Sequence, residues 1–290
     1  MEKAKVYFTK EVSPDALVKM YEVLGVELPG KVAVKLHSGE QGNKNYLRPE
    51  FVEKLVQRVN GTVVECNTAY PGARDTTEKH QKLMDEHGWS KYFDVDIMDS
   101  EGPDMELDIP NGTQIKKNYV GKHMANYDSM LVLSHFKGHA MGGFGGALKQ
   151  LSIGCASSYG KGYIHGAGKV KESIFGTDQL QFVTSMGDAA SSVHKYFNGH
   201  IVYINCMVNI SIDCDCDGNA SAPCMADIGI LASTDPVAID EACLDLVYNS
   251  TDSGKDKLIH RIEEKLGKTI IDVAISNGTG TKDYELINID

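Results

Sequence analysis

The sequence predicts an α/β fold, in which a mostly parallel sheet carries helices on both faces and a glycine-rich segment forms a middle lobe. The main observation is that strand-like and helix-like patterns alternate four times over the first hundred residues, as in consecutive β–α–β units. A second observation is that no internal repeat, low-complexity tract or linker interrupts the 290 residues. We therefore expect one domain over residues 1–290, with 135–175 as a candidate sub-lobe.

The elements of the first half follow from apolar periodicity and from the residues that start and stop helices. Ser13 can cap the first helix, Pro49 opens the second, and Gly88 closes the third. Asn60-Gly61 marks a turn after the second helix. The expected strands are residues 5–8, 31–36, 62–65 and 95–98, and the expected helices are 14–24, 49–59 and 76–87.

The second half begins with a polar stretch, residues 100–117, in which we expect no regular element. Glycine-rich chain covers residues 138–168, and a cysteine-rich loop covers 213–224. Asp235-Pro236 opens a helix, because the carboxylate can cap and proline fits the first helical position. The remaining expected strands are 130–134, 201–210, 228–232 and 284–289, and the remaining helices are 178–196, 236–247 and 255–266.

The composition excludes several classes of protein. Lys and Arg number 29 against 40 Asp and Glu, so the formal charge is −11, and a nucleic-acid backbone would be repelled. No apolar run approaches the length of a membrane span, and residues 1–10 lack the apolar stretch of a signal peptide. Seven cysteines without a leader indicate reduced thiols. We expect a cytoplasmic protein with no nucleic-acid or membrane partner.

The most informative feature is a stretch without carboxylates. Residues 129–171 hold no Asp or Glu, although the chain's average density predicts roughly six. The stretch holds five lysines and three histidines, and five of the nine residues 138–146 are glycine. Glycine-rich turns at the carboxyl edge of a parallel sheet present backbone amides to anions, and lysines add attraction. We predict a site for a phosphate or a substrate carboxylate, which includes Gly145, Gly146 and Lys149.

Known glycine motifs do not describe this stretch. Residues 143–146 lack the third glycine of a dinucleotide-binding fingerprint, and the phosphate-binding P-loop pattern does not occur. The alternative interpretation is a glycine-rich loop that is packed for steric reasons, with its lysines on a solvated face.

His135 and His139 lie four residues apart, with Lys137 between them at the end of a predicted strand. This spacing pairs two metal ligands on a helix, but the neighbouring glycines argue against a helix. Phe136 stands where a zinc protease of this spacing needs its glutamate, which excludes that class. We expect His135, Lys137 and His139 to be catalytic residues, and the alternative is that they are structural.

Four of the seven cysteines lie within 19 residues. In extended chain, Cys214 and Cys216 point the same way and could present two sulfurs to one metal ion, with Cys206 and Cys224 as further ligands. The carboxylates at 213, 215 and 217 should raise the thiol pKa values, which favours a bound cation over a thiolate nucleophile. The spacing matches neither zinc knuckles nor ferredoxins. Reduced cysteines in a packed acidic turn are the alternative.

Several separated motifs resemble those of the family called domain of unknown function 362. They are K-L-H-S-G-E-Q-G-N with Y-L-R-P at 35–49, S-H-F-K-G-H at 134–139, G-G-F-G-G-A-L-K at 142–149, G-C-A at 154–156, D-C-D-C at 213–216, and the segment 227–240. The likeness runs from about residue 5 to residue 287. A looser, fold-level analogy connects the chain with nickel-pincer lactate racemases, whose α/β lobes hold a metal cofactor with His and Lys.

The resemblance also bears on cofactors and partners. Many members of the family carry an inserted two-cluster ferredoxin module, but this chain has no cysteine between Lys161 and Gly199 and lacks that insertion. The cofactor is unknown; a transition metal and an iron–sulfur cluster are the candidates. A redox partner protein and a homo-oligomer are the candidate assemblies.

The same resemblance groups His37 and Arg48 with these motifs. Both follow the second predicted strand, whose carboxyl end lies at the same sheet edge as His135 and His139. His37 is then a candidate catalytic residue, and Arg48 a candidate anion-binding residue that clamps a carboxylate bidentately. The alternative for Arg48 is a salt bridge to a nearby glutamate.

Three functions follow from these features. The first is an enzyme that acts on a small anionic molecule at the Gly/Lys/His-rich pocket, with or without a metal. The second is a metal or iron–sulfur-binding protein that uses the loop 206–224 without catalysis. The third is a scaffold that lost its ferredoxin module and serves in assembly.

Overall fold

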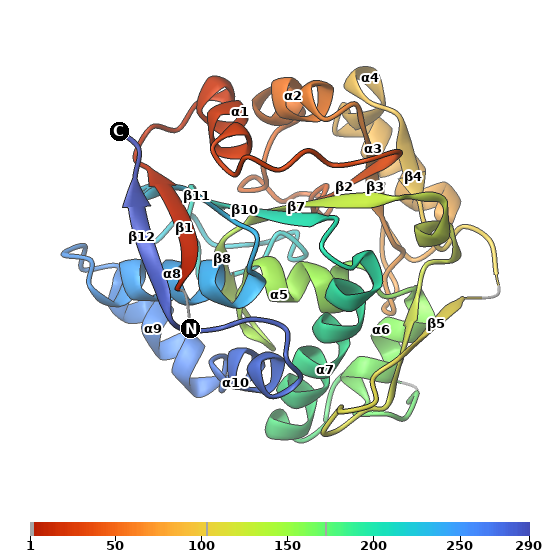
Figure 1. Cartoon of the computed structure of the whole chain (residues 1–290). Helices are drawn as coiled ribbons and strands as arrows, with labels where there is room; N and C mark the ends of the chain where they lie inside the picture. Colours follow the sequence, from red (N-terminus) through yellow and green to blue (C-terminus); the bar gives the residue numbers. More distant parts are fainter. Residues whose placement is uncertain (1–2, 103, 172) are drawn as a thin grey trace.

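One eight-stranded sheet forms the centre of the molecule (Figure 1). The computed structural model describes residues 3–102, 104–171 and 173–290. In spatial order the strands are β12 (Tyr284–Asn288), β1 (Ala4–Thr9), β11 (Gly229–Ser233), β10 (Ile201–Met207), β7 (Ser129–His135), β2 (Val32–Lys35), β3 (Gly61–Glu65) and β4 (Val95–Ile97). Within this sheet β11 runs antiparallel to both neighbours, and the other paired strands are parallel. The predicted mostly parallel sheet is confirmed.

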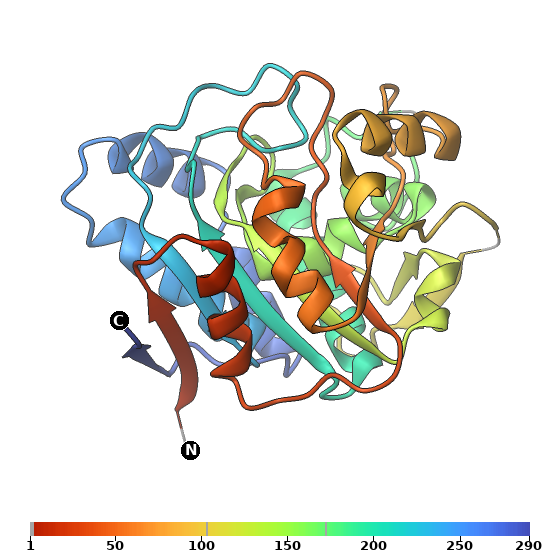
Figure 2. The same ribbon diagram turned by 90° about the horizontal axis from the view of Figure 1, so that it is seen from above.

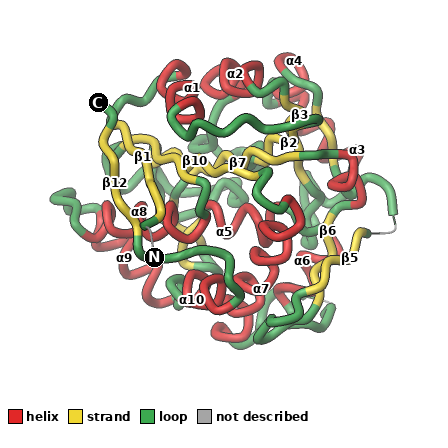
Figure 3. Tube along the Cα trace, in the orientation of Figure 1, coloured by secondary structure: helices red, strands yellow, loops and turns green. Residues whose placement is uncertain are grey.

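Helices cover both faces of this sheet, as the sequence predicts (Figures 1 and 3). On one face lie α1 (Pro14–Glu22), α2 (Pro49–Arg58), α3 (Thr77–Glu86) and α4 (Trp89–Tyr92), and Figure 2 shows α1 and α2 lying across the strands. The other face carries α5 (Ala147–Lys149), α7 (Gln179–Phe197), α8 (Pro236–Tyr248) and α10 (Thr269–Ser276), with α6 (Ser158–His165) and α9 (Lys255–Glu264) beside them.

Two buried apolar clusters, one on each face, hold these layers together. Leu17 of α1, Leu55 of α2 and Trp89 of α4 belong to the first, and Phe182 of α7 and Ile239 of α8 belong to the second. All five side chains are at most 2% exposed, and burying each such chain contributes about 1.5–3 kcal/mol. The clusters fix the strands between them, which sets the positions of the strand ends.

The predicted helix ends are confirmed where side chains satisfy backbone groups. Ser13 Oγ accepts a hydrogen bond from Ala16 N at 3.0 Å, and Asp235 Oδ1 accepts from Val237 N and Ala238 N at 2.9 Å. The chain after α3 turns at Gly88, whose φ of 84° is in the left-handed region.

Some elements were missed by the sequence patterns. The polar stretch forms the hairpin β5 (Met105–Asp108) and β6 (Lys117–Val120), helix α10 was not expected, and the 3₁₀ turn η1 (Lys122–Asn126) precedes β7. The strand expected over 201–210 ends at Met207, because the chain turns at Asn209 with a φ of 47°. These short elements depend on contacts with α6, α7 and α8 rather than on their own periodicity.

The glycine-rich segment has more regular structure than expected. It forms the small antiparallel pair β8 (Lys137–His139) and β9 (Gly143–Gly145), then α5, a π-helical turn η2 (Gln150–Gly154), and α6. Its buried side chains Phe144, Leu148 and Ile164 share one cluster with α7 and α8. The residues of the candidate sub-lobe therefore pack into the main core. In the described part of the chain, no helix has the length and apolarity needed to cross a membrane.

Candidate functional site

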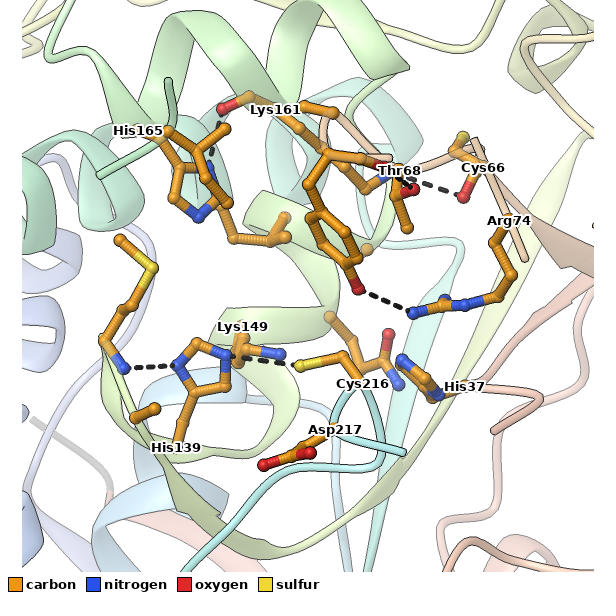
Figure 4. Close-up of a pocket in the computed structure, with 18 of the residues that line it drawn as sticks. His37, Cys66, Thr68, Arg74, His139, Lys149, Lys161, His165, Cys216 and Asp217 are labelled. Atoms are coloured by element: carbon orange, nitrogen blue, oxygen red, sulfur yellow. Dashed lines mark hydrogen bonds between the residues drawn. The ribbon is translucent and has the colours of Figure 1, made fainter. Parts of the chain in front are cut away.

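A cavity of about 300 Å³ lies at the carboxyl edge of the sheet (Figure 4). Strands β2 and β3 end beneath it, and the segment after β10 closes one side, because parallel strands bring their carboxyl ends to one edge. The carboxylate-free stretch contributes nine of the lining residues, from β8 through η2 to α6. The lining includes His37, Glu65, Tyr70, Arg74, His139, Lys149, Lys161, His165, Phe175, Cys216 and Asp217.

Lys161 supplies a buried positive charge to this cavity. Its side chain is anchored in α6, and Nζ donates to Ala156 O at 2.6 Å and to Cys66 O at 3.4 Å. Among the described residues no carboxylate forms an ion pair with it. Burial removes the ammonium from water and lowers the pKa of Lys161. A buried ammonium held only by carbonyl oxygens favours an anion beside it.

Lys149 is a second cation in the lining. Its Nζ donates to Cys214 Sγ at 3.5 Å. Burial alone would lower the pKa of Lys149, but the charges of Cys214 and Cys216 outweigh burial and raise it. Lys149 therefore stays protonated beside the thiols.

Three histidines line the cavity as neutral rings. Burial lowers the pKa of His165 to about 4. Burial and the charge of Arg74 lower the pKa of His37. Burial and the charge of Lys149 lower the pKa of His139. The positive charge of the cavity at neutral pH therefore comes from lysine and arginine.

The backbone fixes which nitrogen of each ring carries the proton. His165 Nδ1 lies 2.7 Å from Lys161 O, which can only accept, so Nδ1 donates and Nε2 has the free lone pair. His37 Nδ1 accepts from Gly39 N at 3.0 Å, and His139 Nδ1 accepts from Gly142 N at 2.8 Å. Those two rings therefore carry their protons on Nε2. One proton acceptor and two donors line the same cavity.

Arg74 and Glu65, two further charged groups of the lining, are paired within the protein. Arg74 Nη2 lies 3.0 Å from Glu40 Oε2 and 3.0 Å from the Tyr70 hydroxyl. Glu65 Oε2 lies 2.7 Å from Lys35 Nζ, and its other oxygen accepts from Ser38 N at 2.9 Å. Burial raises the pKa of Glu65, but Lys35 and the nearby histidines outweigh it and hold that carboxyl ionised.

His135 and Lys137, predicted as catalytic, lie behind the cavity and not in its lining. His135 Nε2 donates to Val208 O at 2.6 Å, while Nδ1 lies 2.9 Å from Asp215 Oδ1. Lys137 Nζ lies 2.6 Å from Asp215 Oδ2. Both side chains thus contact Asp215, which ties its loop to β7 and β8. His37 and His139 do line the cavity.

Arg48 also lies elsewhere than expected. Its side chain is exposed, the guanidinium lies 4.0 Å from the Tyr46 ring centroid, and Nη2 donates to Lys44 O at 2.9 Å. Among the described residues it neither lines the cavity nor forms an ion pair with a glutamate, and Glu40 pairs with Arg74. The anion-binding role expected of Arg48 is not supported in this cavity.

The backbone amides after the glycine turn bind a carboxylate of the protein itself, the side chain of Asp240. Asp240 of α8 accepts from Ala147 N at 2.8 Å and Leu148 N at 2.9 Å. A Cβ on Gly146 would lie 2.3 Å from Asp240 Oδ1, and one on Gly145 would lie 3.4 Å from the Lys149 chain. Asp240 thus occupies the amides that follow the two glycines, and Gly145 and Gly146 make room for Lys149 and Asp240; a ligand role for the two glycines stays a prediction.

Two of the four predicted metal-binding cysteines meet beside the cavity. Cys214 Sγ, Cys216 Sγ and one ring nitrogen of His139 all lie within 4.8 Å of one another. Cys206 is buried inside β10, and Cys224 is half-buried on a separate turn; neither joins this group. A cluster with four cysteine ligands does not fit this arrangement, so the iron–sulfur expectation for loop 206–224 is not supported by the donor set.

The expected effect of the loop carboxylates on the thiols was wrong for Cys214. The hydrogen bond from Cys216, with Lys149, Lys137 and His139 nearby, lowers the pKa of Cys214 well below its ordinary range. Cys216 holds the shared proton, and its pKa is raised. Asp213 turns instead to Ser221 and Arg261. Asp215 likewise pairs with His135 and Lys137.

Sequence reasoning missed Lys161, His165, Arg74 and Glu65 as residues of the site. Lys161 and His165 lie inside the carboxylate-free stretch, which was the signal that could have found them. Arg74 and Glu65 belong to the carboxyl end of β3 and the loop after it, which carry no motif.

The fold and the cavity define an α/β protein with a ligand-sized pocket at the carboxyl edge of a parallel sheet. The chain belongs to the family described as Domain of unknown function (DUF362), whose model matches residues 32–245. The family indicated by the sequence motifs is thus confirmed. No curated protein matches the chain.

Several solved structures resemble the chain. One is the lactate racemase apoprotein from Thermoanaerobacterium thermosaccharolyticum, with 13% identity, a TM-score of 0.43, and coverage of 70% of this chain and 50% of that one. Another is a protein from Thermotoga maritima, with 10% identity, a TM-score of 0.43, and coverage of 90% and 58%. The chain spans about half the length of these two structures.

Proposed function

We propose that this protein is an enzyme that binds a small anionic molecule in the cavity and transfers a proton to or from it. The observation that carries the proposal is the buried ammonium of Lys161, which has carbonyl partners and forms no ion pair among the described residues. Burying an ion without a counter-charge costs several kcal/mol. An anion in the cavity would recover part of that cost, and Lys149 would add a second positive charge.

The shape and lining of the cavity support a small ligand with an apolar part. A volume of about 300 Å³ is at the lower end of the range for ligand pockets, ~300–1,000 Å³. Met141, Ile153 and Phe175 give apolar surface beside the charged groups. A carboxylate on a short carbon skeleton has the combination of charge and apolar surface that this lining recognises.

The three neutral histidines support proton transfer. His165 Nε2 has a free lone pair and is the candidate general base. His37 and His139 carry protons on Nε2 and are candidate donors to a developing negative charge. A base and two donors around a bound anion are the groups that abstraction of a proton next to a carboxylate requires.

Calorimetric titration tests the binding step. The probes are inorganic phosphate and a panel of small mono- and dicarboxylates, and the variant is Lys161→Met. Loss of a charged hydrogen bond of about 1.5–3 kcal/mol should weaken binding about 10- to 100-fold. Lys169→Met, at an exposed position outside the cavity, is the matched control and should bind as the wild type does. Equal affinity in Lys161→Met and the wild type would refute the proposal.

A further inference from the structure

Cys214 and Cys216 form a rigid pair of neighbouring thiols. Asp215, between them, turns toward Lys137 and leaves both sulfurs on the opposite side of the loop. Glu40 N donates to Asp215 O at 2.8 Å, and Asn43 Nδ2 donates to Asp217 O at 2.8 Å and to Cys214 O at 3.3 Å. The loop after β2 thus ties down the cysteine loop from its other side, so the two sulfurs are held in place before any ligand arrives.

His139 is close to these sulfurs, but its hydrogen bonds make it a donor. Its Nδ1 accepts from Gly142 N at 2.8 Å and from Met141 N at 3.2 Å, so the proton of the neutral ring lies on Nε2. Nε2 lies 3.7 Å from Cys216 Sγ. Histidines that bind metals usually donate a hydrogen bond from the other ring nitrogen, and here that nitrogen faces two N–H groups. The ring is therefore set to donate to sulfur, not to bind a metal ion.

We propose that Cys214 and Cys216 bind one cuprous ion as a two-coordinate bis-thiolate, with His139 and Lys149 as surrounding donors. Soft thiolates select soft ions such as Cu(I). Zinc takes four ligands in structural sites, whereas no further Cys, His, Asp or Glu in the described ranges joins this group. Because the proton on His139 Nε2 prevents that nitrogen from binding a metal ion, the two sulfurs are the only ligands of this group.

The local charge suits this complex. Two thiolates and one Cu(I) carry a net charge of −1, and Lys149 Nζ, 3.5 Å from Cys214 Sγ, supplies the balancing positive charge. Binding releases the proton that the two sulfurs share to solvent and transfers no electron, so the ion stays cuprous. Cys216 and His139 line the cavity, which gives the ion a path to the sulfurs. The copper site shares Lys149 and His139 with the cavity lining, but its two ligands are the sulfurs, so copper uptake is measured without any anion in the cavity.

Anaerobic titration with Cu(I) against a chromophoric cuprous chelator tests the site in the whole chain. The wild type should take up one equivalent, and Cys214→Ser and Cys216→Ser should each lose this stoichiometric binding. Cys224→Ser is the matched control, because Cys224 is outside the group, and it should keep one equivalent. No stoichiometric uptake by the wild type, or uptake retained in the double serine variant, would overturn the proposal.

X-ray absorption at the copper edge of the loaded wild type tests the ligand set without relying on a variant that must fold. Two sulfur ligands and no nitrogen are expected. A nitrogen ligand, or a three- or four-coordinate ion, would overturn the two-coordinate assignment. In a parallel titration Zn(II) should bind more weakly than Cu(I), and tighter binding of Zn(II) would count against the proposal.

Discussion

Lys137 Nζ lies 2.6 Å from Asp215 Oδ2 in a buried ion pair that joins the glycine-rich segment to the cysteine loop. The ion pair connects strand β8 with the loop that carries Cys216, and both segments contribute residues to the cavity lining. It holds together two segments whose paired residues lie 78 positions apart in the sequence. His135 completes the arrangement by a second hydrogen bond to the same carboxylate.

Asp215→Asn should destabilise the protein strongly. The substitution leaves the buried Lys137 ammonium without its counter-charge and weakens the hydrogen bond to His135, and breaking a buried pair in this way costs about 3–5 kcal/mol. Urea unfolding at neutral pH measures the loss in the free energy of unfolding. Asp217→Asn is the control at an exposed carboxylate and should change stability little. A loss below about 1 kcal/mol in Asp215→Asn would contradict the anchoring role.

Stability should fall as pH decreases from about 6.5 toward 4. Burial lowers the pKa of His165 and of His194 to about 4, below the unfolded value. Between these two pKa values the unfolded state therefore binds more protons than the folded state. The contribution of these histidines to the free energy of unfolding is fully present only at a pH above the unfolded pKa. Each such histidine contributes up to about 1.4 kcal/mol per pH unit to the slope.

Urea unfolding at several pH values between 7.5 and 4.5 gives this slope. His194→Gln, which lies outside the cavity, should make it shallower. An unfolding free energy that stays constant from pH 7 to pH 5 would contradict the lowered pKa values, because it would mean that the folded and unfolded states bind equal numbers of protons.

His165→Asn should separate binding from proton transfer. The asparagine amide can replace the hydrogen bond from Nδ1 to Lys161 O, but it removes the basic Nε2. Anion affinity should change by a few-fold at most, whereas exchange of the proton next to the bound carboxylate should fall by about 10²- to 10⁴-fold. Nuclear magnetic resonance in D₂O measures this exchange for the tightest-binding carboxylate. Unchanged exchange in the variant would remove His165 as the base.

Gly146→Ala should be destabilising by about 1–3 kcal/mol. The added Cβ would lie 2.3 Å from Asp240 Oδ1, and this carboxylate holds the first turn of α5. Gly162→Ala in α6 is the matched control, because its nearest neighbour lies at 3.7 Å. There the substitution should stabilise the helix by up to about 1 kcal/mol. Thermal unfolding of both variants checks the contrast, and equal effects would disprove the role of Gly146.

The strands of the main sheet could be predicted from the sequence, whereas the short elements outside it could not. The runs that become β2, β3, β7 and β10 are apolar and bounded by turns, so they could be recognised one by one. The hairpin β5–β6 could not, because its strands are polar on one side and gain their order from contact with α6 and α7. Helix formation by Gly-rich residues in α6 likewise depends on packing.

The site was predictable in composition more than in geometry. The missing carboxylates of residues 129–171 pointed to Lys149 and His139, and Lys161 and His165 lie in the same stretch although they were not singled out. The side-chain pairings within the site could not be predicted. Nothing in the sequence indicates that Asp215 forms an ion pair with Lys137, or that Asp240 accepts hydrogen bonds from the backbone after the glycine turn. Arg48 and Arg74 look equally able to bind an anion in the sequence, and only the fold places Arg74 in the cavity.

The most direct test of the central claim is a crystal structure of the protein with the tightest-binding anion from the calorimetric panel. The account predicts that the anion lies in the cavity, with an oxygen within hydrogen-bond distance of Lys161 Nζ, and that His165 Nε2 faces it. An anion that binds tightly at another surface, while the cavity around Lys161 holds only water, would contradict the account.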